Sequence, residues 1–180
     1  VIVTTTPEND FKITAQQLAE ACTDKTKAFV LNSPNNPTGM IYTREELEAL
    51  AKVIVEKDIY VVADEMYEYL IYGEDEHVSI ASLGKEIYDH TITCAMTGWR
   101  IGYTGASKEI TKLMSSVQSH QTSNPNSIAQ KAALEALTGP QDKVKEMIKE
   151  FAQRRDYIYG RLKDLPHISV IEPKGAFYTF

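Results

Sequence analysis

The segment Ile59-Tyr-Val-Val-Ala-Asp64-Glu65 is a short apolar run that ends in two acidic residues. Its length and its valines predict a buried strand, because such runs are typical of parallel strands inside an α/β sheet. In an open sheet of this kind, ligands bind beyond the carboxyl ends of the strands. Asp64 and Glu65 are therefore predicted to lie at the edge of the sheet where a binding site forms.

The residues before this segment supply another strand and the helix that connects the two. Residues 27–31 are predicted to form a strand, and Thr43-Arg-Glu-Glu46 has the capping-box pattern that begins a helix. Apolar side chains follow at helical spacing, at Leu47, Leu50, Ala51, Ile54 and Val55. The order strand, helix, strand predicts parallel pairing, and so an α/β fold.

The alternation continues beyond residue 65. Periodicity predicts strands at residues 91–94 and 101–106, and helices at 110–117, 124–137 and 142–162. Further strands are predicted at residues 168–171 and 176–180. Residues 73–90 are polar and have no predicted element. A change of domain is predicted within or after the helix at 142–162.

Composition limits the possible partners. The 180 residues include 19 Lys+Arg against 25 Asp+Glu, a formal net charge of −6. A negative protein repels phosphate backbones and anionic lipid, so we expect neither nucleic acid nor a membrane as partner. No apolar run reaches the roughly 20 residues that cross a bilayer. Cys22 and Cys94 form no CxxC pair, and no signal peptide precedes them, which favours the cytoplasm.

Two kinds of site have little support in the sequence. The histidines stand singly, without the spacing of zinc ligands, so no metal site is predicted and surface or packing roles are expected for His77, His90, His120 and His167. An ATPase also uses a strand that ends in Asp, but it needs a phosphate loop. The only Gly-Lys pair, Gly84-Lys85, has Ser79 and Glu86 where that loop requires Gly and Ser or Thr.

Two loops add candidate ligand-binding groups. In Ser33-Pro-Asn-Asn-Pro-Thr-Gly39, two prolines stiffen a turn from which an Asn amide can reach a bound ring. In Met96-Thr-Gly-Trp-Arg-Ile-Gly-Tyr103, an arginine lies in a glycine-containing turn, where it is suited to bidentate capture of a phosphate.

Taken in order, these motifs resemble the class I/II aminotransferases, pyridoxal-phosphate enzymes of fold type I. NNPTG, ADEMY and AMTGWRIGY occur in series, with Asn36, Asp64 and Arg100 separated by 28 and 36 residues. Residues 123–130 and 173–178 match later stretches of the same family. The resemblance implies a three-layer α/β/α large domain with a mainly parallel sheet, followed by the start of a small C-terminal domain.

The resemblance also implies a role for each matching residue. Asp64 would keep the pyridine nitrogen of pyridoxal 5′-phosphate protonated, so that the ring accepts electrons. Tyr67 and Asn36 would hydrogen-bond the phenolic oxygen of the ring, and Arg100 would pair with the phosphate. By the same resemblance, the Asn36–Pro37 peptide bond is expected to be cis.

The lysine that forms the Schiff base in this family has no counterpart in the sequence, so the catalytic residue is unknown. The family pattern has about seven further residues, including a serine and this lysine, between the positions of Cys94 and Ala95. Lys108 and Lys85 lie outside that interval and are expected at the surface. Either the segment belongs to the protein and is absent from this sequence, which we favour, or it has been lost.

The sequence therefore predicts an aminotransferase that moves an amino group between an amino acid and a 2-oxo acid, as a cytoplasmic homodimer. Residues 1–150 are assigned to part of the cofactor-binding large domain, and residues 151–180 to a linker helix and the start of the small domain. The first residue, Val1, and the apolar run at the end predict a partial chain. Two alternatives stay open: a C–S lyase on the same fold, and an inactive cofactor-binding or structural fragment.

Overall fold

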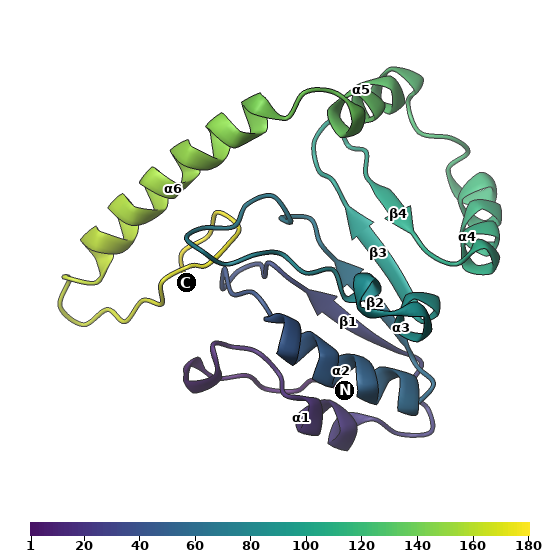
Figure 1. The fold of residues 1–180 in the computed structure, drawn as a ribbon, viewed down its shortest axis with the longest axis horizontal. Coiled ribbons are helices and arrows are strands. Elements are labelled where there is room, and N and C mark those ends of the chain that lie inside the picture. The colour runs from purple at the N-terminus through teal and green to yellow at the C-terminus, as the bar shows by residue number, and fades with distance from the viewer.

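The computed structural model describes residues 1–180 and contains helices, short 3-10 turns (η) and a four-stranded sheet (Figure 1). The elements are, in order, η1 (Pro7–Asn9), α1 (Ala15–Ala21), β1 (Ala28–Asn32), α2 (Arg44–Glu56), β2 (Tyr60–Asp64), η2 (Ile80–Leu83), α3 (Lys85–Asp89), β3 (Thr91–Ala95), β4 (Tyr103–Gly105), α4 (Lys108–Gln121), α5 (Ser127–Thr138) and α6 (Asp142–Leu162). None of the helices combines the length and apolarity needed to cross a membrane.

The sheet confirms the predicted α/β class. Its strands lie in the order β1-β2-β3-β4, with the first three parallel and β4 antiparallel to β3. The register aligns Asn32 with Asp64 and Asp64 with Cys94, so the carboxyl ends of β1, β2 and β3 lie side by side at one edge of the sheet.

The two faces of the sheet have different surroundings. One face packs beneath α2 and α3 and includes the buried side chains of Leu31, Val61 and Ala63. The opposite face is open: the side chain of Val30 is 69% exposed and that of Tyr60 is 45% exposed. These residues thus supply the sheet and one helical layer against it.

The helix that covers the sheet forms where its sequence pattern predicts. Thr43 accepts a hydrogen bond from the Glu46 amide, and the Glu46 carboxylate accepts one from the Thr43 amide, which completes the capping box of α2. Leu47, Leu50 and Ile54 are fully buried on one face of the helix. This apolar stripe fixes α2 across β1 and β2.

Two parts of the fold differ from the sequence-based predictions. Residues 73–90 contain η2 and α3, which place Ile80 and Ile87 in the core. The strands predicted at residues 168–171 and 176–180 are wrong: neither segment joins the sheet. Residues 174–176 instead exchange backbone hydrogen bonds with Gly39, Leu70 and Tyr72, so their extended chain pairs with loops.

The helices after β4 lie around the outside of the sheet (Figure 1). The long helix α6 has the bounds that its periodicity predicts, residues 142–162. Neither α4 nor α6 contains a fully buried residue. The core that positions the candidate site is therefore built by residues before 96, with the C-terminal segment added to one edge.

Candidate functional site

The carboxyl edge of the sheet carries Asp64 at its centre. The side chains of Asn32, Asp64 and Cys94 share the open face, because partners in register point the same way. The Asn32 amide donates a hydrogen bond of 3.2 Å to the Asp64 carbonyl, and the Met66 amide donates one of 3.3 Å to the Asp64 carboxylate. The Asp64 carboxylate is thus held at the edge of the sheet with part of it accessible.

The pKa of the Cys94 thiol reflects the negative charge at this edge of the sheet. Burial raises the pKa of Cys94, and the neighbouring carboxylates of Asp64 and Glu65 raise it further. The edge therefore has a negative field in the absence of a bound cation, which suits a protonated ring nitrogen placed against Asp64.

The loop at residues 33–39 comes from β1 and lies beside Asp64. Its Asn36 amide donates a 2.7 Å hydrogen bond to the side chain of Asn32. The bond between Asn36 and Pro37 is cis, as predicted, and so is that between Ser33 and Pro34. Gly39 has φ of 70°, and a Cβ there would lie 2.7 Å from that of Pro173, so this turn requires glycine.

Three side chains from distant parts of the sequence meet next to Asp64. The hydroxyls of Tyr67 and Tyr178 are hydrogen-bonded at 2.5 Å, and the Asn36 side chain donates a 3.3 Å bond to Tyr178. Burial and the Tyr178 hydroxyl raise the pKa of Tyr67 to about 12, and the charge of Asp64 adds to the increase. We call these residues (Asn36, Tyr67 and Tyr178) the hydroxyl trio.

Sequence reasoning identified two members of the trio and missed the third. Tyr178 lies in the motif Pro173-Lys-Gly-Ala-Phe-Tyr178, which was recognised as a family match without a role for its tyrosine. Tyr178 also lines a cavity of 480 Å³ between α6 and residues 176–179, which includes Phe151 and Arg155. Of the trio, Tyr178 alone lines this cavity, and Asp64 does not line it either.

The fourth predicted site residue, Arg100, is not brought into contact with the others. It is exposed in the turn between β3 and β4 and makes no side-chain hydrogen bond or ion pair. Met96, Trp99 and Arg100 all have positive φ, at 71°, 50° and 56°. A left-handed backbone costs each such residue about 1–2 kcal/mol, so the turn at residues 96–100 is strained.

The site has no lysine that could anchor a cofactor. No lysine side chain bonds to Asn36, Asp64 or Tyr67, and Lys85 pairs with Asp89 on the surface of α3. The remaining groups do fit the ring of a pyridoxal cofactor: a carboxylate for its nitrogen, and phenol and amide donors for its oxygen. The residues present therefore match the ring, and the covalent anchor is missing.

The family model for aminotransferase class I and II matches the chain over residues 1–180. An aspartate aminotransferase of Bacillus sp. (strain YM-2) is 49% identical over 185 residues, covering 99% of this chain and 47% of the relative. The crystal structure of the aspartate aminotransferase from Rhizobium meliloti has a TM-score of 0.95 at 37% identity, covering 99% of this chain and 47% of that one. The chain spans about half the length of the curated relatives it matches.

One alignment bears on the missing segment. An asparagine–oxo-acid transaminase of Streptococcus mutans serotype c is 44% identical over 187 residues, covering 100% of this chain and 48% of the relative. Since this chain has 180 residues, the alignment contains seven positions without a counterpart here. That number equals the length predicted for the segment between Cys94 and Ala95.

Proposed function

The chain belongs to the aminotransferase class I and II family, and from this premise we propose that it forms the cofactor-binding part of a pyridoxal-phosphate aminotransferase. The observation that carries the proposal is the hydroxyl trio beside Asp64 at the carboxyl edge of the sheet. Bound pyridoxal phosphate would supply an electron sink for the pair left on the substrate carbon when its proton is removed.

Each residue has a defined task in this proposal. The Asp64 carboxylate would keep a proton on the ring nitrogen, which strengthens the electron sink. Tyr67 would donate to the ring oxygen, because a tyrosine hydroxyl is protonated at neutral pH, and its raised pKa of about 12 keeps it protonated at alkaline pH as well. Asn36 would donate to the same oxygen, and Arg100 would pair with the phosphate once the turn that carries it is brought to the site.

The wider properties of the protein are proposed on the same premise. The substrates would be an amino acid and a 2-oxo acid, since the relatives are named as aspartate aminotransferases and as an asparagine–oxo-acid transaminase. We propose a cytoplasmic homodimer, with residues 1–150 in the large domain and residues 151–180 leading into the small one. That boundary lies within α6, which is continuous across it.

The missing lysine favours a second candidate function for the chain as written. Without an anchor, it would bind the cofactor non-covalently and catalyse no amino transfer. Such binding still stabilises the native state, by about 2.7 kcal/mol at about 100 times the Kd.

Two measurements test these functions. Thermal unfolding with added pyridoxal phosphate should show an increase in Tm that is reduced in Asp64→Asn and kept in the control Asp58→Asn, whose side chain is 95% exposed. An equal increase in all three proteins would contradict the proposed site. Borohydride reduction followed by peptide mass analysis then separates the candidates: no labelled lysine is expected from the 180-residue chain, and a labelled lysine with amino-transfer activity would refute the non-covalent candidate.

The reaction products distinguish an aminotransferase from the remaining alternative, a C–S lyase on the same fold. An aminotransferase forms a new amino acid from the added 2-oxo acid, whereas a C–S lyase releases pyruvate and ammonia. Intact mass spectrometry of the protein shows directly whether further residues lie between Cys94 and Ala95. A protein that contains them is expected to transfer amino groups.

A further inference from the structure

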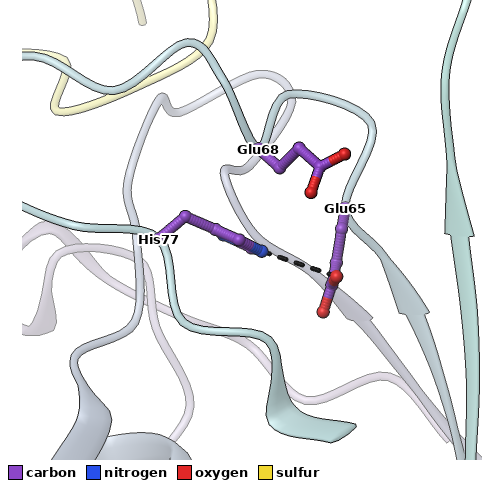
Figure 2. Close-up of side chains that lie close together, drawn as sticks. All are labelled: Glu65, Glu68 and His77. Carbon is purple, nitrogen blue, oxygen red and sulfur yellow. Dashed lines mark ion pairs between the residues drawn. The ribbon is translucent and has the colours of Figure 1, made fainter. Parts of the chain in front are cut away.

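A cluster of ionisable side chains lies behind the carboxyl edge of the sheet, separate from the hydroxyl trio. Glu65 follows β2 directly, Glu68 lies one turn further on, and His77 comes from the loop that leads to η2 (Figure 2). One ligand atom from each residue lies within 4.8 Å of the other two. We call these residues (Glu65, Glu68 and His77) the Glu–His cluster.

The central groups of the cluster lack hydrogen-bond partners. The Glu65 side chain is only 7% exposed and accepts no hydrogen bond, and the buried Nε2 of His77 has none either. The His77 Nε2 and a Glu65 carboxylate oxygen form an ion pair at 3.5 Å. Figure 2 marks this pair with a dashed line. Buried polar groups nearly always have hydrogen bonds, and the Nε2 of His77 has none, so this nitrogen is free to bind a ligand that the Glu65 carboxylate could share.

The charge of the cluster points to the kind of partner. No lysine or arginine forms an ion pair with Glu65 or Glu68, and the one hydrogen bond to Glu68 comes from the Tyr103 hydroxyl, at 3.2 Å. Glu65 is buried and Glu68 is half-buried, and a buried negative charge is costly unless a cation neutralises it.

We propose that Glu65, Glu68 and His77 bind a divalent metal ion of the zinc class. Two carboxylates balance its charge, and the imidazole nitrogen favours zinc over magnesium or calcium, which prefer oxygen ligands. Tetrahedral bonds of about 2.0–2.2 Å hold donor atoms about 3.3–3.6 Å apart. The 3.5 Å between Glu65 and His77 matches this spacing, and Glu68, within 4.8 Å of both, would move closer on binding. A water molecule would complete the tetrahedral shell.

The site is distinct from the cofactor residues and does not rest on the proposed function. Glu65 and Asp64 are consecutive, but Glu65 is buried near Leu31, Leu47 and Ala63, whereas Asp64 lies on the open face. Bound zinc would tie the end of β2 to the loop at residue 77. It would therefore stabilise the segment that also carries Tyr67.

Zinc binding to the purified, chelator-stripped protein is the test, measured by isothermal titration and native mass spectrometry. One zinc ion per chain is expected. His77→Ala and Glu65→Gln should each weaken binding by more than about 100-fold, because even an outer partner of a ligand is worth about 10- to 100-fold. The matched control is His90→Ala: His90 lies 3.1 Å from the Ile59 carbonyl and 4.0 Å from Asp58 and contacts no member of the Glu–His cluster, so its loss should leave the affinity unchanged.

Controls keep the result interpretable if a variant is unstable. Circular dichroism in chelator identifies variants that have lost the fold, and for such a variant Glu68→Gln provides a substitution at a more exposed ligand. Zinc affinity unchanged in His77→Ala and Glu65→Gln would overturn the proposal. So would zinc that is lost only when Cys22 or Cys94 is replaced by serine, since the thiols would then be the ligands.

Discussion

The two faces of the sheet are built from the same strands but are stabilised differently. Val61 and Ala63, on the face beneath α2, are 0% and 1% exposed, whereas Val30 and Tyr60 on the other face are largely exposed. Alternate residues of one strand therefore contribute unequally to the buried core. The covered face supplies the packing that holds the strands in register, and the open face leaves Asp64 accessible at their ends.

The open face also accounts for the large accessible surface of the chain. Its accessible area is 12049 Å², whereas a compact monomer of this length exposes about 8,800 Å². Exposed apolar side chains lie on the open face of the sheet and on α4, α5 and α6, where Leu113, Ile128 and Tyr157 are more than half exposed. Stability of this chain therefore depends mainly on the layer formed by α2, α3 and the covered face.

The largest effect should come from deleting a side chain under that layer. Ile54 of α2 is 0% exposed, and Ile54→Ala should lower the free energy of unfolding by about 2–5 kcal/mol because it leaves a cavity. Urea unfolding measures this change. Val30→Ala on the open face is the control and should change stability by about 0.5 kcal/mol or less. Similar losses in both variants would mean that something covers the open face in solution.

Replacing one valine by threonine on each face gives a second comparison of the two faces, with a smaller expected effect. Val61→Thr replaces a methyl group with a hydroxyl in the closed interior and should cost about 1–3 kcal/mol, since that hydroxyl is left without a partner. Val30→Thr makes the same change on the neighbouring strand, where water can bond the hydroxyl, and should be nearly neutral. Equal unfolding free energies for the two variants would contradict the assignment of the faces.

The covered face could be predicted from the sequence, because its signals are local. The capping box at Thr43 and the apolar spacing of α2 depend only on nearby residues, and β1 begins and ends within one residue of its predicted bounds, 27–31. The extended segment at residues 168–180 has a strand-like pattern too. It pairs with loops at Gly39 and Leu70, and local pattern does not specify a partner.

The site was predictable only in part for the same reason. Asn36, Asp64 and Tyr67 lie in motifs whose order carries the family resemblance, and the structure brings them together. The contact between Tyr67 and Tyr178 joins residues 111 positions apart, and no spacing rule indicates it. His77 stands alone in the sequence and meets Glu65 only when β2 and the following loop are folded.

The hydrogen bond between Tyr67 and Tyr178, at the end of the open face, can be tested by substitutions with a smaller expected effect on stability. Tyr67→Phe and Tyr178→Phe each remove the hydrogen bond between the two hydroxyls, so each should lower the free energy of unfolding by about 0.5–1.5 kcal/mol. The double variant should cost little more than either single one, because the same bond is lost. Tyr157→Phe, at an exposed tyrosine of α6, is the matched control. Fully additive losses would show that the bond does not form.

The smallest effect should appear at alkaline pH, where the same tyrosine titrates. The pKa of Tyr67 is raised from 10.0 to about 12 in the folded protein by burial and by Tyr178. Between these values the unfolded chain releases a proton that the folded chain retains, so the stability contributed by Tyr67 is complete below pH 10 and is lost as the pH rises toward 12. Tyr103, whose pKa is likewise raised to about 12 by burial and Glu68, adds a decline over the same range.

Unfolding midpoints measured across this range should fall less steeply in Tyr67→Phe, and less steeply still in the double variant with Tyr103→Phe, than in the unmodified protein. Parallel slopes in all three would mean that neither hydroxyl is held in its neutral form by the fold, and that the edge of the sheet is as open to water as the face beside it.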